Sequence, residues 1–282
     1  MEDVLYAMDK TNLHGLGLSA LDESIYARVV KETSRIHRIN PDKAGFILPN
    51  ENVVFNAREY NTREGLHVLT IGYSYDEAKP ETEIRKIIEK GLENKALVVL
   101  DHPFVDNIYT KTAGHISEEL GVELEKLCSE YPGQIAVEWN GYCIPWMRLG
   151  LLPILNIGDS FLGMVLNSLG EKGLRSRFSL PYKTEYYDVN KKAEELAEKY
   201  NLPLLADTDL HARAKKALEA MGTSRFIVDV EGDFAAEIVD SMKRNIFARD
   251  HENVERYVSG WHLFRYFCLP VLFDKIFKKP RA

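Results

Sequence analysis

Two kinds of apolar pattern alternate along the chain. Short apolar runs bounded by Gly, Pro, Asn or Asp predict buried strands at residues 15–18, 46–48, 67–71, 96–100, 135–137, 202–205 and 226–228. Stretches with apolar residues every three or four positions predict helices at residues 2–9, 22–37, 80–92, 113–131, 159–169, 191–200, 212–221 and 235–245. Strand–helix alternation of this kind favours a mostly parallel α/β sheet or barrel.

Segment 150–187 has the least regular pattern, and we interpret it as an insertion or a pair of long loops carrying one helix. Long loops at the rim of a barrel are where substrate is usually held. Three arginines in or beside this segment are either phosphate ligands or solvated loop charges: Arg148, Arg175 and Arg177. We predict a barrel domain over residues 1–250 and an extension over residues 251–282.

The end of that extension, residues 261–282, is rich in apolar residues and then basic. One interpretation is a helix that contacts a membrane surface or a protein partner. The other is a last helix that packs on the barrel and ends in a solvated basic tail.

Charge and cysteine content limit the function classes. The chain has 282 residues and a formal net charge of −7, which argues against broad nucleic-acid binding through a basic surface. Its three scattered cysteines form no Cys-x-x-Cys pair, so a reducing environment is expected. The N-terminus lacks a signal-peptide pattern, and no uninterrupted apolar stretch reaches the roughly 18 residues of a membrane span. We therefore expect a cytoplasmic protein.

Ionisable residues follow the predicted strands, most clearly at Asp209-Leu210-His211 after the apolar run 202–206. Alternation along an extended strand end projects Asp209 and His211 to the same side. One carboxylate oxygen and one imidazole nitrogen suit a divalent transition metal, although the same tripeptide can be a capped turn.

The same arrangement recurs at other predicted strand ends, which carry Glu51, His67, Asp101, His102, Glu138 and Asn140, while the run 15–20 leads to Asp22 and Glu23. In a parallel barrel the carboxyl ends of the strands converge on one face. Such a group predicts a site for zinc, manganese or iron. Each residue also has a structural alternative: His67 can bond a neighbour, Asp22 can cap a helix, and Glu138 and Asn140 can orient ligands.

Taken together, these motifs resemble the PHP superfamily (polymerase and histidinol phosphatase) over residues 1–248. The matching segments, in chain order, are Leu21-Asp22-Glu23, Asn50-Glu51, Gly65-Leu66-His67-Val68-Leu69, Asp101-His102-Pro103-Phe104, Val137-Glu138-Trp139-Asn140 and Thr208-Asp209-Leu210-His211. The resemblance implies a distorted (β/α)7 TIM-like barrel of the PHP type.

The resemblance also implies a set of metal ligands: Asp22, Glu51, His67, His102, Asp209 and His211. Glu51 stands where the family has a carboxylate that bridges two ions. Glu23 stands where the family has a histidine, and Glu23 or Asp101 would transfer a proton. The family's His-x-His motif would precede the helix at 2–9, and no residue before Met1 carries it. We therefore expect one or two divalent ions rather than three.

The implied function is metal-dependent phosphoester hydrolysis by a metal-activated water, on a phosphomonoester or a nucleotide-type substrate. The negative net charge favours a small phosphorylated substrate over nucleic acid. An alternative is a catalytically degenerate PHP domain that binds a ligand or a partner. A further alternative is a scaffold or membrane-associated protein that uses residues 261–282.

Overall fold

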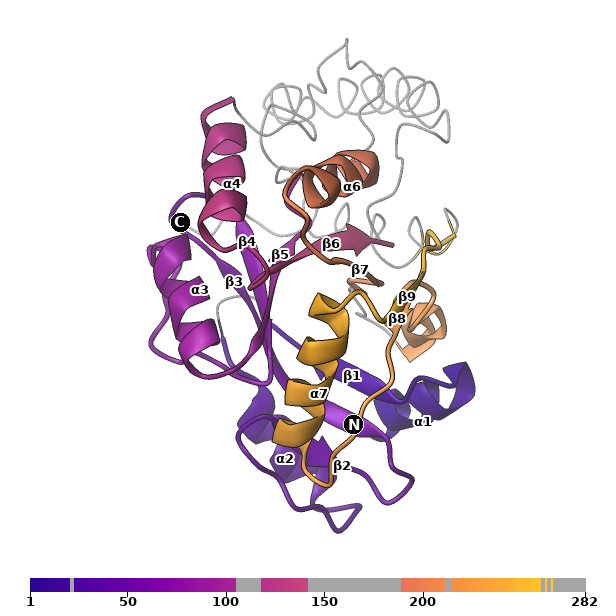
Figure 1. Ribbon diagram of the computed structural model, residues 1–282. Helices are drawn as coiled ribbons and strands as arrows, with labels where there is room; N and C mark the ends of the chain where they lie inside the picture. The colour runs from indigo at the N-terminus through magenta and orange to yellow at the C-terminus, as the bar shows by residue number, and fades with distance from the viewer. Residues whose placement is uncertain are drawn as a thin grey trace, which may run out of the picture.

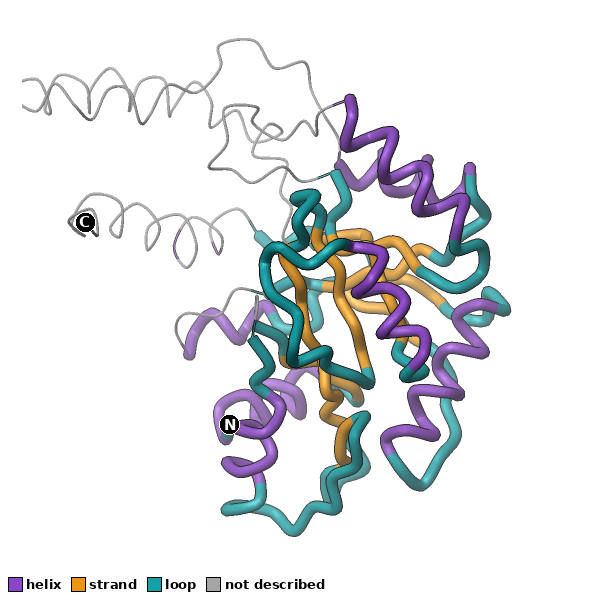
Figure 2. Tube along the Cα trace, turned by 90° about the vertical axis from the view of Figure 1, so that its left-hand side faces the viewer, coloured by secondary structure: helices purple, strands orange, loops and turns teal. Residues whose placement is uncertain are grey.

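The computed structural model describes residues 1–20, 23–104, 118–141, 189–210 and 215–259, together with residues 262 and 265. Outside these residues lie the irregular segment with its helix and three arginines, nearly all of segment 261–282, and two of the predicted ligands, Asp22 and His211. In the described part, a central layer of strands is covered by helices (Figures 1 and 2).

The central sheet has seven strands in the order β1-β3-β4-β5-β6-β7, with β2 paired to β3 as well. Their bounds are β1 Gly15–Leu18, β2 Gly45–Ile47, β3 Val53–Asn61, β4 His67–Ile71, β5 Leu97–Asp101, β6 Ala136–Asn140 and β7 Leu204–Asp207. A separate two-stranded sheet pairs β8 (Arg225–Ile227) with β9 (Glu252–Val254), which lies in the predicted extension.

The prediction of a (β/α)7 TIM-like barrel is wrong. Such a barrel needs parallel strands throughout, whereas β2–β3, β3–β4 and β4–β5 pair antiparallel. In the part of the chain that the structure describes, the parallel pairs are β1–β3, β5–β6 and β6–β7. Within the described residues, β7 has no strand pairing with β1 that would close the sheet. The fold is a mixed α/β fold with a curled, half-barrel sheet.

A β-hairpin between β3 and β4 is the cause of this difference. The chain turns back at once between the two strands, because Thr62 N donates to Leu66 O at 3.1 Å and Gly65 adopts a φ of +85°. The sequence pattern showed β4 but missed β3, whose apolar run is interrupted by the buried polar residues Asn56 and Arg58. A parallel crossover was therefore expected where a hairpin exists.

Helices cover both faces of the sheet. Three of them, α3 (Ile84–Glu93), α4 (Glu118–Glu130) and α6 (Val189–Lys199), pack on one face, around Val68, Val98 and Val137. Helix α7 (Ala235–Phe247) packs on the other face, against Leu97 and Val99 (Figure 1). The sheet is thus the middle of three layers, as expected when strands are apolar on both faces.

The remaining helices pack near β1 and β2. Helices α1 (Glu2–Thr11) and α2 (Tyr26–Thr33) share a core with β2 and with Met221, which follows the 3-10 helix η2 (Lys215–Ala220). The helix predicted at 22–37 is shorter than expected, since α2 covers residues 26–33. Of the helix predicted at 212–221, the structure describes the 3-10 helix η2. Among the described residues, no helix has both the length and the apolar character needed to cross a bilayer.

The buried Arg58 fixes the segment between β4 and α3. Its guanidinium donates to Tyr75 O at 2.6 Å and to Ala78 O at 3.2 Å, and it stacks on the Tyr60 ring. We expect Arg58→Met to lower the free energy of unfolding by about 3 kcal/mol, because both buried carbonyls lose a charged donor. Urea denaturation measures this loss. Arg63→Met, at a half-exposed surface ion pair, should cost less than about 1 kcal/mol, and equal losses would contradict the assignment.

Candidate metal centre

Strand alternation directs a row of ionisable side chains to the α7 face of the sheet. On β5, Leu97 and Val99 pack toward α7, so Asp101 continues the same face. On β3, β4, β6 and β7 the same alternation turns one ionisable side chain each to this face: Glu59, His67, Glu138 and Asp207. At one edge of the apolar core beneath α7, these carboxylates and the His67 imidazole therefore lie in a row across the strands.

The strand register places these residues beside one another. His67 lies directly opposite Asp101 in the β4–β5 pair. Glu59 lies diagonally across from His67, because its partner on β4 is Leu69. On the other side, Glu138 pairs with Leu205, which is two residues before Asp207. Residues far apart in the chain thus meet at one edge of five adjacent strands, β3 to β7.

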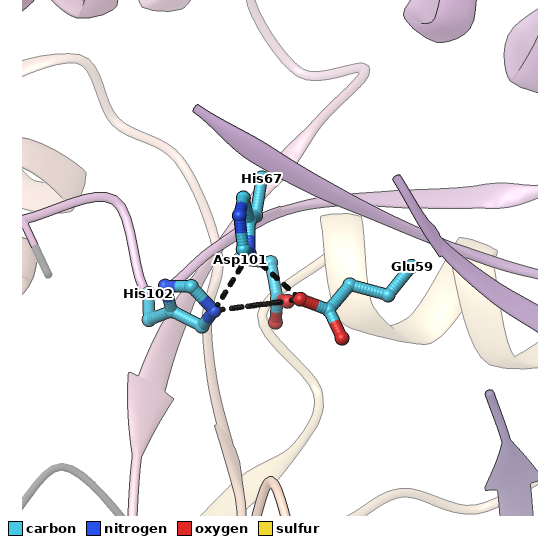
Figure 3. A group of neighbouring side chains, drawn as sticks. All are labelled: Glu59, His67, Asp101 and His102. Atoms are coloured by element: carbon cyan, nitrogen blue, oxygen red, sulfur yellow. Dashed lines mark hydrogen bonds and ion pairs between the residues drawn. The ribbon is translucent and has the colours of Figure 1, made fainter. Parts of the chain in front are cut away.

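Three of these side chains converge on a common point with the side chain of His102, which follows β5. We call the four the histidine cluster: Glu59, His67, Asp101 and His102 (Figure 3). His67 Nδ1 lies 2.7 Å from Glu59 Oε1 and 3.1 Å from His102 Nε2. His102 Nε2 lies 3.6 Å from Glu59 Oε1 and 3.5 Å from Asp101 Oδ2. These side chains are mostly buried, with 5 to 23% of their surface exposed.

A second group, which we call the acidic cluster, consists of Asp101, Glu138 and Asp207. One carboxylate oxygen from each lies within 4.8 Å of the others. Asp101 is 4% exposed and Glu138 is 1% exposed. Asp101 belongs to both clusters and connects them.

The two clusters perturb one another electrostatically. Burial, followed by the nearby carboxylates, raises the pKa of Asp101 and of Glu138 well above the ordinary range, although the His102 charge opposes the shift at Asp101. Burial raises the pKa of Asp207 to about 6. At Glu59 burial acts in the same direction, but hydrogen bonds with His102 and His67 outweigh it and lower the pKa.

His102 shows the opposite balance, since its pKa is raised to about 10. Burial alone would lower this pKa, but the charge of Asp101 and the close contact with Glu59 stabilise the imidazolium. An excess of buried negative charge thus surrounds His102. A bound cation would neutralise the same charge.

Two residues of the site have left-handed backbone conformations that non-glycine residues seldom adopt. His102 has a φ of 29° and Asp209 a φ of 44°. Glu138 holds His102 by accepting a hydrogen bond from its backbone N–H. Asn140 Nδ2 donates to Asp209 Oδ2 at 2.9 Å, and Asn190 fixes the Asn140 backbone in turn. Glu138 and Asn140 therefore make contacts that orient other site residues.

The donor geometry of the histidine cluster fits a divalent ion. With bonds of about 2.0–2.2 Å, adjacent donors are separated by roughly 2.8–3.1 Å in octahedral and roughly 3.3–3.6 Å in tetrahedral coordination. The four distances above, from 2.7 to 3.6 Å, cover nearly the same range. Two imidazoles with carboxylates are ligands that zinc, manganese and iron accept. The cluster could therefore hold a metal ion.

Three of the predicted site residues lie in the histidine cluster: His67, Asp101 and His102. Asp209 lies close enough for its charge to raise the pKa of Asp101. The groups of potential ligands that the described residues form include neither Glu51 nor Glu23. Both are exposed, and Glu23 forms an isolated β-bridge with Ala20.

Glu51 is remote from the cluster because it precedes β3, whereas Glu59 lies near the other end of that strand. At roughly 3.3 Å per residue, the extended chain between Val53 and Glu59 spans about 20 Å. The bridging carboxylate that the resemblance implied at Glu51 is therefore not part of this group.

Glu59 and Asp207 were missed in the sequence. Glu59 has the same alternation as Val53, Phe55 and Ala57, so a carboxylate on the apolar face of a strand was the available signal. Asp207 ends β7 two residues before Asp209, and it too continues the face of a core residue, Leu205.

Neither the family models nor the curated proteins that were compared contain a match to this chain. Among solved structures, the chain is similar to the crystal structure of PsfC from Pseudomonas syringae PB-5123. The TM-score is 0.52 at 11% sequence identity, covering 97% of this chain and 88% of that one. Similarity at this level of identity shows a common fold, and it leaves the chemistry to be argued from the site.

Proposed function

We propose that this protein is a metal-dependent phosphoesterase that resembles the PHP superfamily in its chemistry. The observation that carries the proposal is the convergence of two imidazole nitrogens and two carboxylates in the histidine cluster. Since the predicted barrel is wrong, the proposal depends on the site and not on the fold.

Each residue of the cluster has a defined part in this proposal. His67 Nδ1 and His102 Nε2 supply nitrogen ligands and Glu59 supplies an oxygen ligand, with zinc, manganese or iron as the ion. A bound divalent ion supplies Lewis acidity, which neutralises phosphoryl charge and lowers the pKa of water. Glu138 holds the His102 backbone in place. Of the two proton-transfer candidates, Asp101 lies in the cluster and Glu23 does not.

The charge of the site supports metal dependence. Four carboxylates crowd this end of the sheet, from Glu59, Asp101, Glu138 and Asp207. In their ionised forms they would repel a phosphate ester, because like charges in a poorly solvated site interact strongly, and a bound cation would offset that charge. A small phosphorylated molecule is the substrate class that we propose.

Removal of the metal tests this function. After treatment with a chelator, the protein should not hydrolyse para-nitrophenyl phosphate, and added zinc, manganese or ferrous iron should restore hydrolysis. Glu59→Gln should lower the restored rate at least about tenfold, since it weakens a ligand. Glu51→Gln is the matched control and should keep the wild-type rate. Equal rates in the two variants, or hydrolysis without metal, would contradict the proposal.

A second candidate function is a catalytically degenerate domain that binds a metal and a ligand without turnover. The position of Glu51 favours it, because the carboxylate expected to bridge two ions lies at the far end of β3. This alternative predicts stoichiometric metal in the cluster with no hydrolysis of any phosphomonoester in a broad panel.

A further inference from the structure

We infer that Asp101, Glu138 and Asp207 form a second cation position, which is built from oxygen ligands alone and shares Asp101 with the histidine cluster. The inference deepens the proposed function, on which it rests for the first ion. The ligand would be a hard divalent cation such as Mg²⁺ or Mn²⁺.

The first observation is the placement of the three carboxylates. They come from the neighbouring strands β5, β6 and β7, and the strand alternation turns all three to the α7 face. Their ligand oxygens lie within 4.8 Å of one another. Oxygens that bind one Mg²⁺ or Ca²⁺ at about 2.1–2.4 Å are separated by at most roughly 4.2–4.8 Å. The three oxygens are therefore close enough together to bind a single ion.

The second observation concerns hydrogen bonds that are missing. Glu138 is 1% exposed, and its Oε2 accepts the His102 backbone N–H. Among the residues that the structure describes, neither Glu138 Oε1 nor the buried Oδ1 of Asp207 receives a hydrogen bond from a donor group of another side chain or backbone. The two carboxyl groups can hydrogen-bond to each other only when one of them carries a proton. Buried carboxylate oxygens without a donor are strongly unfavourable in proteins. One cation between them would satisfy both atoms without that proton.

The chemistry of the donors selects the class of ion. The acidic cluster offers neither nitrogen nor sulfur, and carboxylate oxygens prefer magnesium, manganese or calcium. The histidine cluster, with its two imidazoles, suits zinc or iron better. The two positions should therefore differ in their metal preference, and manganese is the ion that both accept.

Because both cation positions use Asp101, the role of this residue changes. With one ligand position on each side, its carboxylate becomes a ligand common to both ions rather than the proton acceptor. Two adjacent cations could each take one oxygen of a phosphoryl group, as in two-metal phosphatases and nucleases. This arrangement suits the phosphate esters of the proposed function.

Manganese stoichiometry tests the inference on the full-length chain. Protein stripped with a chelator is dialysed against Mn²⁺ alone, and bound manganese is measured by plasma mass spectrometry. Wild type should bind two equivalents. Asp207→Asn and Glu138→Gln, which keep the side-chain shape, should each bind one, while Asp233→Asn on the exposed surface should bind two. Circular dichroism confirms that each variant is folded.

The outcomes separate this inference from the proposed function. If wild type binds a single equivalent that Asp207→Asn retains and His67→Ala loses, the second position is overturned and the histidine cluster stands. If wild type binds a single equivalent that Asp207→Asn loses and His67→Ala retains, the acidic position is supported and the proposed function is overturned. Two equivalents in Asp207→Asn, or none in wild type, would also overturn the inference, and carboxylates that share protons would then explain the acidic cluster.

Discussion

Replacing His67 by alanine is expected to lower the affinity of the protein for zinc or manganese by more than about 100-fold. Loss of a hydrogen-bonded neighbour of a ligand already costs roughly 10- to 100-fold, and His67 is proposed as a ligand itself. Its Nδ1 lies 2.7 Å from Glu59 Oε1 and 3.1 Å from His102 Nε2, so its removal leaves a gap in the donor set. Competition with a chromophoric chelator measures the dissociation constant.

His14→Ala provides the control for this experiment. His14 is exposed and lies before β1, away from the cluster in the sequence of strands. It should leave the dissociation constant unchanged. If both alanine variants bound metal as tightly as wild type, His67 would be a histidine that only bonds its neighbours.

Replacing Gly141 by alanine is expected to lower the free energy of unfolding by about 3 kcal/mol. A Cβ atom there would lie 2.5 Å from Ser224 Cβ, 2.9 Å from Arg256 O and 3.0 Å from Asp207 O. Two of these atoms are backbone carbonyls that cannot rotate away. Gly141 also donates to Asp207 O and accepts from Val258 N, both at 2.9 Å, so the backbone is held on both sides.

Urea denaturation compares this variant with Gly133→Ala. A Cβ at Gly133 meets no atom within 4 Å, and only its left-handed φ of +67° is strained, which costs about 1–2 kcal/mol. A smaller loss at Gly141 than at Gly133 would show that the chain near the end of β6 can shift. Because Gly141 follows Asn140, its variant should also weaken metal binding.

The sequence predicted regular, well-bounded elements well. The strands predicted at 15–18 and 67–71 are confirmed as β1 and β4, and the helix predicted at 235–245 is confirmed as the greater part of α7. The prediction failed at β3. Asn56 and Arg58 are buried there because groups distant in the sequence form hydrogen bonds with them. Such partners cannot be inferred from periodicity, and without β3 the hairpin and the antiparallel pairing could not be foreseen.

The candidate site was predictable only where its residues lie next to strands that the sequence pattern revealed. His67, Asp101 and His102 stand at the ends of apolar runs, so the position alone marked them. Glu59 was hidden with its strand, and Asp207 was obscured by the neighbouring Asp209 motif. Glu51 has the local sequence context of a ligand, but it lies at the opposite end of β3 from the cluster. Its role was inferred from a barrel that the chain does not form.

Elemental analysis tests the central claim most directly. Wild-type protein and His102→Ala are purified without chelator and without added metal, and both are measured by plasma mass spectrometry. The proposed site predicts at least one equivalent of zinc, manganese or iron in wild type and its loss in His102→Ala. Equal metal content in the two proteins, or no metal in wild type even after dialysis against all three ions, would contradict it.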